Sequence, residues 1–308
     1  MRAIAVTSLA LAAFLLPQSM EAQEPGIKIA VGDVGLGIGD VPRLDGLRLN
    51  FRDLHLVRAR GVNATIWMPY DESRGAVQGL ALGLPLTGAR TMEGVALGLG
   101  VGVEQSFAGV GFAPIGLGAG GPIRGIAVAG VGIGSGGDVE GVMVGGVGLG
   151  SGGDIRGIAV GGVGGGASGD LTGLAIGGVG FGVGGNLTGI ALGGVGVGVG
   201  GELKGLAVSG IGAGASRISG VVLAGVGAGA ETVRGVVIAP AYFKVTPGGT
   251  LRGVSVSAFN DLRQASQHGL TIGLLNIAEE LHGVQIGLIN IARNKRSFSV
   301  LPLVNYHR

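Results

Sequence analysis

The sequence predicts an all-β repeat protein, a parallel β-solenoid of about sixteen coils with a period of 14–18 residues. A 16-residue unit repeats six times between Gly121 and Ser216, and its glycines keep a fixed phase. Within each unit, aliphatic residues recur at a spacing of two, the period of a β-strand. Polar residues recur 16 positions apart, as in-register stacking of coils requires. A short, fixed period indicates one small unit stacked on copies of itself.

Glycine dominates the composition, with 71 of 308 residues, about three times its usual share. Each glycine placed in a strand costs roughly 0.5–1 kcal/mol relative to alanine, so the glycines must meet a steric demand. Aliphatic residues in every unit argue against ordinary disorder. The absence of Gly-X-Y triplets with proline excludes collagen. One glycine phase comprises Gly125, Gly141, Gly157, Gly173, Gly189 and Gly205.

The N-terminus has the pattern of an export signal, which we assign to residues 1–22. Arg2 gives a basic start, residues 3–16 are apolar but too short to span a bilayer, and Pro17 ends the run. We expect an N-terminal cap at 23–44, the Gly-rich β-repeat domain at 45–296 and a C-terminal cap at 297–308. The chain has no cysteine, which excludes a disulfide scaffold and an acylated lipoprotein.

The unit that begins at Asp170 illustrates the expected coil. Its aliphatic residues alternate with other residues, and this alternation shifts by one position at Gly173 and again at Gly177–Gly178. Each shift predicts a corner of the coil. We expect the aliphatic side chains to point inward and Ala175 with the glycines to point outward, so that aspartate at Val179 disrupts the array. In the alternative orientation the aliphatic side chains point outward, the glycines line a narrow interior and lipid is the partner. The aliphatic positions are Leu171, Leu174, Ile176, Val179, Phe181 and Val183.

Three columns of residues support stacking in register. Arg124, Glu140 and Arg156 alternate in sign at intervals of 16 residues. An acidic or amide residue begins each unit, where such residues favour turns; this column is Asp138, Asp154, Asp170, Asn186 and Glu202. The third column is wholly apolar: Ile123, Val139, Ile155, Leu171, Leu187 and Leu203.

An antiparallel outer-membrane β-barrel is the alternative fold. Export, high hydropathy and the unbroken alternation of residues 95–103 favour it. Membrane strands need about 9–11 residues of alternation, whereas the central units break it twice every 16 residues. The solenoid is therefore the preferred prediction.

The two ends of the chain differ from its Gly-Val-Gly middle. The segments G-L-T-I-G-L-L-N-I-A (269–278) and G-V-Q-I-G-L-I-N-I-A (283–292) share a pattern with residues 46–50 and 301–305. They resemble a family of bacterial surface proteins with repeated G-(L/V)-x-(I/L)-G-L-x-N units. The resemblance covers about a third of the chain and implies a cell-surface or outer-membrane setting in a Gram-negative envelope. It brings no catalytic residues.

Residues with reactive side chains are few and scattered. The histidines are His55, His268, His282 and His307, and a metal site at His268 and His282 would need Glu279 or Glu280. We favour surface histidines there, and turn-capping aspartates over a calcium site in the acidic column. Residues 161–166 lack the G-K-(S/T) of a phosphate loop, and Ser135 and Ser151 lie in coils without histidine. We expect no catalytic, cofactor-binding or metal-ligating residues, and no enzyme.

The expected function is that of an exported, non-enzymatic cell-surface or envelope protein with a structural or adhesive role. One alternative is an outer-membrane barrel acting as a passive pore or anchor, and another is an ice- or surface-binding protein. The expected partners are envelope components or a second copy of the chain, with membrane association as a further option. A net charge of +2 without a basic cluster excludes nucleic acid, and no small-molecule substrate is evident.

Overall fold

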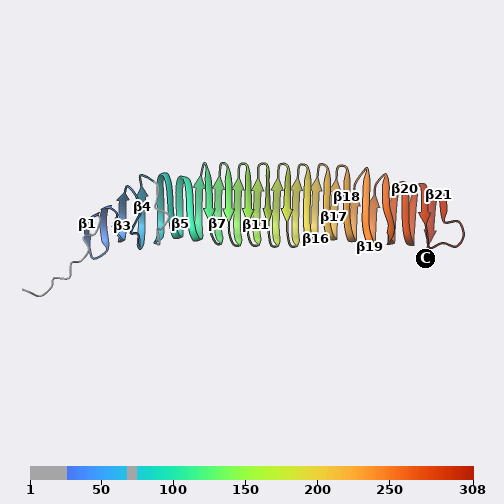
Figure 1. The fold of residues 1–308 in the computed structure, drawn as a ribbon, viewed down its shortest axis with the longest axis horizontal. Coiled ribbons are helices and arrows are strands. Elements are labelled where there is room, and N and C mark those ends of the chain that lie inside the picture. The colour runs from blue at the N-terminus through green and yellow to red at the C-terminus, as the bar shows by residue number, and fades with distance from the viewer. Residues whose placement is uncertain (1–25, 68–74) are drawn as a thin grey trace, which may run out of the picture.

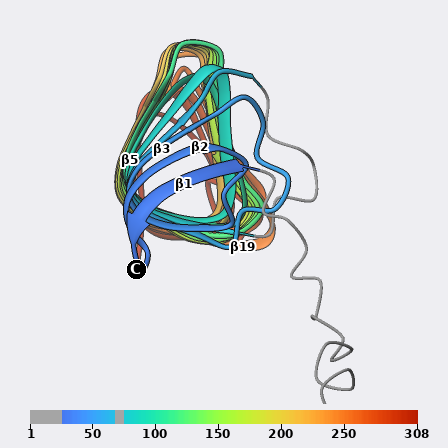
Figure 2. The ribbon, with the colours of Figure 1, turned by 90° about the vertical axis from the view of Figure 1, so that its left-hand side faces the viewer.

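The computed structural model describes residues 26–67 and 75–308, so the expected signal peptide at 1–22 lies outside the described residues. The described chain forms an elongated rod of stacked coils, with its strands perpendicular to the long axis (Figure 1). It is a parallel β-solenoid of about 14 turns with a 16-residue period, which confirms the predicted fold class, with fewer turns than the sixteen coils expected. Viewed along the rod, each coil has a roughly triangular outline (Figure 2).

All regular elements of the described residues are strands. They are β1 (Gly26–Val31), β2 (Val34–Gly39), β3 (Arg43–Asn50), β4 (Arg58–Thr65), β5 (Ala76–Ala113), β6 (Gly116–Ala119), β7 (Ile123–Ala129), β8 (Gly132–Ser135), β9 (Val139–Gly145), β10 (Gly148–Ser151), β11 (Ile155–Gly161), β12 (Gly164–Ala167), β13 (Leu171–Gly177), β14 (Gly180–Val183), β15 (Leu187–Gly193), β16 (Gly196–Ser209), β17 (Gly212–Ala224), β18 (Gly227–Ile238), β19 (Tyr242–Val256), β20 (Phe259–Ala292) and β21 (Val300–His307). The longest strands run around corners of the coil without a break.

Successive coils pair in parallel and in register. In the central array each residue pairs with the residue 16 positions later, as Leu171 does with Leu187 and Leu187 with Leu203. The antiparallel alternative is therefore wrong for this array. Antiparallel pairs occur at the two ends, where β1 pairs with β2 and β21 with β20.

One corner of the coil requires glycine. Gly173 has φ +129°, a conformation that residues with a Cβ rarely adopt. A Cβ at Gly173 would also overlap the carbonyl oxygen of Gly157 in the coil below. The glycines that recur every 16 residues from Gly125 to Gly205 therefore all lie at this corner. We call these residues the corner glycines: Gly46, Gly61, Gly79, Gly94, Gly109, Gly125, Gly141, Gly157, Gly173, Gly189, Gly205, Gly220, Gly235, Gly253, Gly269 and Gly283.

The expected inward orientation of all aliphatic residues is wrong. Leu174, Ile176 and Val179 lie on the outside of the coil, whereas Ala175 is buried. The reason is the narrow vertex between the two longer sides, where a Cβ at Gly177 would overlap the backbone of Gly180. Only small residues fit inside there, so the larger ones face outward. The interior positions of this coil are Leu171, Ala175, Gly177, Phe181 and Val183.

The core is a set of stacked columns. The predicted apolar column from Ile123 to Leu203 is buried throughout, which confirms its placement. Large and small residues alternate between neighbouring coils at one position of the core. The Phe181 ring and the Leu149 side chain, from the coils on either side, fill the volume that a side chain at Gly165 would need. Such exchange of volume between adjacent coils keeps the interior filled although the repeats are not identical.

Polar side chains close the core at both ends. Near the N-terminus the buried Arg48 guanidinium is paired with Asp53 and donates to Asp40 (2.9 Å) and Asn63 (2.9 Å). Near the C-terminus an asparagine ladder forms, with Asn260 donating to Asn276 and Asn276 donating to Asn290, each at 2.7 Å. These hydrogen bonds satisfy polar groups that would otherwise be costly to bury.

Candidate interaction surfaces

The first surface is an outer face built from aliphatic side chains. It consists of the first and third residues after each corner glycine, together with a valine or isoleucine at the next corner, such as Val163 and Val179. We call it the aliphatic face. The first residues are Leu47, Val62, Leu80, Val95, Val110, Ile126, Val142, Ile158, Leu174, Ile190, Leu206, Val221, Val236, Val254, Leu270 and Val284. The third residues are Leu49, Ala64, Leu82, Leu97, Phe112, Val128, Val144, Val160, Ile176, Leu192, Val208, Leu223, Ile238, Val256, Ile272 and Ile286.

The side chains of this face reach solvent. Ile126, Ile158 and Ile190 are 44%, 39% and 42% exposed, and Val179 is 50% exposed. In the part of the chain that the structure describes, no polar residue occupies either of the two main columns between Gly46 and Gly283. A contiguous apolar surface of this length is rare on a monomeric soluble protein and indicates a binding surface.

The outer columns stay apolar even where the interior does not. At the N-terminal end the buried Arg48 lies between Leu47 and Leu49, both of which are exposed. At the C-terminal end the buried Gln285 precedes Ile286, which is exposed. Packing of the core therefore does not explain the outer aliphatic residues, because they persist around a polar interior.

The aliphatic face also continues over the two antiparallel end strands. In β1, Ile27 pairs with Ile38 of β2 and extends the column of third residues. In β21, Val304 pairs with Ile286 and Tyr306 pairs with Val284. The face thus runs from one end of the described rod to the other.

The second surface is nearly bare backbone. Two outward columns of glycine cover the strands that follow the valine corner, and we call them the glycine face. At Gly134, Gly150 and Gly182 an added Cβ would meet no atom within 4 Å, so sterics within the coil do not demand glycine. The columns are Gly116, Gly132, Gly148, Gly164, Gly180, Gly196, Gly212 and Gly227, and Gly118, Gly134, Gly150, Gly166, Gly182, Gly198, Gly214 and Gly229.

The third side carries the charges and follows the two predicted polar columns. Glu140 lies between Arg124 (3.4 Å) and Arg156 (3.7 Å), which confirms a column of alternating sign. These pairs are solvent-exposed, so each contributes at most about 1 kcal/mol. In these central coils the side therefore presents closely balanced charge to solvent.

The acidic column caps turns, as expected. The Oδ1 atom of Asp154 accepts a hydrogen bond from the backbone N–H of Asp170 (2.9 Å), and Oδ1 of Asp170 accepts one from Asn186 (2.7 Å). The other carboxylate oxygen of Asp154 lies 2.7 Å from the Arg156 guanidinium. These oxygens connect each coil to the next.

Three histidines stack at the C-terminal end. The rings of His268 and His282 are nearly parallel, with centroids 4.7 Å apart, and His307 follows at 6.4 Å. Burial lowers the pKa of His268, and the neighbouring His282 and Arg252 lower it further. His55 lies at the opposite end, 2.8 Å from Asp40. Among the described residues, no three His, Cys, Asp or Glu side chains converge as metal ligands.

The acidic residues near these histidines have other partners. Glu279 pairs with Arg293 (3.2 Å), and Glu280 accepts a hydrogen bond from Ser266 (2.9 Å). Ser135 and Ser151 are buried and donate to backbone carbonyls, Ser135 to that of Gly121 at 2.9 Å. Both serines act as structural hydrogen-bond donors between coils.

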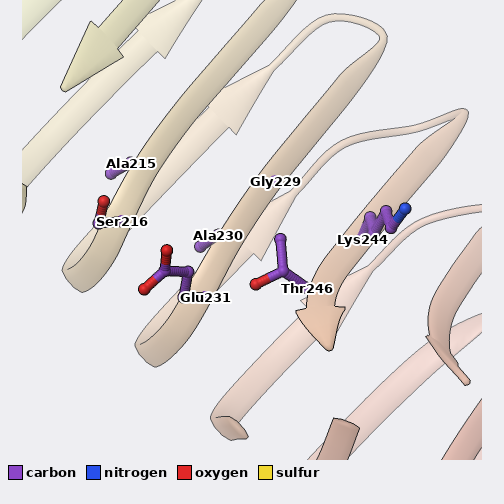
Figure 3. A pocket seen from close by; sticks show the side chains of 7 residues that line it. All are labelled: Ala215, Ser216, Gly229, Ala230, Glu231, Lys244 and Thr246. Carbon is purple, nitrogen blue, oxygen red and sulfur yellow. The ribbon is translucent and has the colours of Figure 1, made fainter. Parts of the chain in front are cut away.

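A shallow hollow lies at the C-terminal limit of the glycine face. It is lined by residues of successive coils and measures about 250 Å³ (Figure 3). Glu231 and Lys244 are the charged side chains of its lining, and the other lining residues are small. Ligand sites usually measure about 300–1,000 Å³ and bury most of the ligand, so this hollow is a weak candidate for a small-molecule site.

A second hollow borders a buried carboxylate. Arg263 donates to both oxygens of Asp261, at 2.8 and 2.7 Å, and the Tyr242 hydroxyl donates at 2.8 Å. Arg263 is the main cause and Tyr242 a further cause of a low pKa at Asp261, about 2 against an ordinary 3.8. Burial and the Asp261 carboxylate raise the pKa of Tyr242.

We expect Asp261→Asn to reduce the sensitivity of the rod to acid. Because the folded pKa is depressed, the ionised carboxylate stabilises the fold above pH 3.8, and this contribution is lost as the pH falls towards 2. Its size is about 1–2 kcal/mol, since Arg263 is half exposed and solvent screens the pair. Urea unfolding between pH 5 and pH 2 measures the effect. Tyr242→Phe should be intermediate, and identical acid profiles of wild type and Asp261→Asn would contradict this assignment.

No family model, no curated protein and no solved structure matches this chain. Among the described residues, no helix is long and apolar enough to span a membrane. The functional interpretation therefore depends on the surfaces themselves. Sequence reasoning held outward-pointing aliphatic residues only as the alternative orientation, although the first and third residues after every corner glycine are apolar.

Proposed function

We propose that this chain is an exported, non-enzymatic protein of the cell envelope with a structural or adhesive role. One observation carries the proposal: the aliphatic face is uninterrupted along the rod, including the coils whose interior is polar. An exposed apolar surface of this extent favours attachment to another apolar surface. The export pattern at residues 1–22 supports an envelope location.

The regular repetition of the coils supports attachment along the whole length of the rod. Each coil presents the same three sides, so binding energy is spread along the rod and adds coil by coil. The charged side keeps water contact while the aliphatic face is covered, which makes the rod amphipathic across its width. Ice binding has less support, because two sides of the rod carry aliphatic or glycine columns. Along the described rod, Thr172 and Thr188 form a stacked pair and not a long threonine column.

Envelope fractionation of the tagged full chain in a Gram-negative host tests the proposal. We expect wild type in the envelope fraction, where it resists a high-salt wash because apolar contacts are not screened by ions. A face variant, Ile126→Thr, Ile158→Thr and Ile190→Thr, should be released. The matched control, Gly134→Ser, Gly150→Ser and Gly182→Ser, adds hydroxyl groups to the glycine face of the same region and should be retained.

Two results would contradict the proposed function. One is a cytoplasmic location of the wild-type chain, which would remove the export assignment. The other is equal salt resistance of the face variant and the wild type, which would show that the aliphatic face does not attach the protein. Circular dichroism of each variant separates release from unfolding.

A further inference from the structure

We propose that the aliphatic face binds the same face of a second copy, so that two rods pair side by side. This inference rests on the proposed function, in which the face attaches to another apolar surface. It identifies that surface as the aliphatic face of a second copy. The face is a sheet surface with no partner within one described chain, and a second copy offers a surface of the same chemistry, length and repeat.

The area of the face suits a stable dimer. About 14 turns, at about 4.8 Å per turn, give a length of about 67 Å. The outward segment from Leu174 to Gly178 has five residues, which at about 3.3 Å per residue is a width of about 16 Å. Each copy therefore offers about 1,100 Å², and the pair buries about 2,200 Å². Stable specific interfaces bury about 1,600 Å² in total.

The repeat of the face favours a partner with the same repeat. Rows of Val, Ile and Leu follow one another at the inter-strand spacing of about 4.8 Å, and each row stands between grooves. Two such faces interdigitate over their full length because their spacings are equal, as the inner faces of a β-sandwich do at a separation of about 10 Å. A surface with another spacing matches only a few rows.

The border of the face is less suited to lipid. Surfaces that adsorb to bilayers carry a cationic border and interfacial Trp or Tyr. Here the cations nearest the central coils are paired with acids, as Arg124 and Arg156 are with Glu140. In the described residues, the two main columns contain no Trp, and they continue into Tyr306 on the end strand. The exposed Trp67 stacks on Phe51 near the N-terminal end of the rod, away from the central coils.

The ends of the rod are protected against end-to-end pairing. The terminal strand β1 carries Lys28 and β21 carries Pro302. Charge and proline on an edge strand hinder the addition of a further strand. The buried cluster around Arg48 and the asparagine ladder also close the core at its two ends. Association is therefore directed to the sides of the rod.

Sedimentation velocity of the chain, purified after export and without detergent, tests the pairing. We expect a dimer of the 30.0 kDa chain, less the export signal. The face variant (Ile126→Thr, Ile158→Thr, Ile190→Thr) should be monomeric under the same conditions, because its dimer dissociation constant should be at least tenfold larger. The glycine-face control (Gly134→Ser, Gly150→Ser, Gly182→Ser) should remain dimeric. Unchanged circular dichroism of both variants shows that the fold is intact.

Cysteine cross-linking identifies the face that is used. The chain has no cysteine, so single substitutions give an unambiguous result. Ile176 lies in the third-residue column near the middle of the rod, so Ile176→Cys in two paired copies comes close to the two-fold axis for parallel or antiparallel rods. Ile176→Cys should form a disulfide-linked dimer, whereas Gly182→Cys on the glycine face of the same coil should not.

Each outcome decides the proposal. Cross-linking through Ile176 in a dimer or larger oligomer supports it, and cross-linking only through Gly182 overturns it. A wild-type monomer at all concentrations overturns it too, and binding of that monomer to phosphatidylcholine–phosphatidylglycerol vesicles would assign the face to lipid. The proposed function fails separately, through the cellular location and the salt wash, since a monomer can still be retained in the envelope.

Discussion

Gly173→Ala is expected to abolish cooperative folding of the central coils, whereas Gly182→Ala in the same coil should be tolerated. At Gly173 the backbone has φ +129°, and the new Cβ would overlap the carbonyl oxygen of Gly157. The conformation alone costs about 1–3 kcal/mol. Relief of the overlap requires the two coils to separate and lose their parallel hydrogen bonds, so we expect a total above about 3 kcal/mol.

Gly182 is the matched control because it lies in the same coil and faces open space. A Cβ there meets no atom within 4 Å, so alanine should be neutral or stabilising by up to about 1 kcal/mol. Urea unfolding followed by circular dichroism compares both variants with wild type. Equal stability of Gly173→Ala and Gly182→Ala would mean that the corner glycines are not sterically required.

The second large effect is expected from Leu171→Asp, compared with Val179→Asp. Leu171 is fully buried, so the change removes about 2–5 kcal/mol of packing and places an unpaired carboxylate in the core. We expect this array not to fold at neutral pH. Val179 is 50% exposed, so Val179→Asp should change the free energy of unfolding by about 1 kcal/mol or less.

Thermal unfolding at high dilution measures this pair, because dilution removes any contribution from association. Leu171→Asn serves as an uncharged comparison, and its effect should be smaller than that of aspartate. Strong destabilisation by Val179→Asp at high dilution, similar to that of Leu171→Asp, would contradict the outward placement of the valine corner. It would instead support the inward orientation that the sequence alone suggested.

The one-dimensional stacking of coils limits how far each change spreads. Each coil contacts its two neighbours, so stability is close to a sum of coil and interface contributions. A disrupted central coil therefore separates the rod into two stacks with their own end caps. Native-state hydrogen exchange on Gly173→Ala should show lost protection that is greatest near the corner and weaker in distant coils.

Part of this architecture could be predicted from residues alone. The 16-residue phase of Gly157 and Gly173 defined the corner, and the alternating charges of Arg124, Glu140 and Arg156 defined the stacking. The acidic column was predicted to cap turns, and its hydrogen bonds between coils do so. Periodicity is sufficient here because residues one period apart become neighbours in any parallel stack.

The tertiary structure decided which aliphatic residues face water. In the sequence, Leu171 and Leu174 are equally apolar, yet Leu171 is buried and Leu174 lies outside. The choice depends on the triangular coil, whose narrow vertex admits Ala175 and Gly177 and forces larger neighbours outward. The width of an interior is set by the packing of all sides together, so the apolar pattern after each corner glycine did not by itself say which side chains face inward. For the same reason, the aliphatic face emerged as a surface only when the coils were closed.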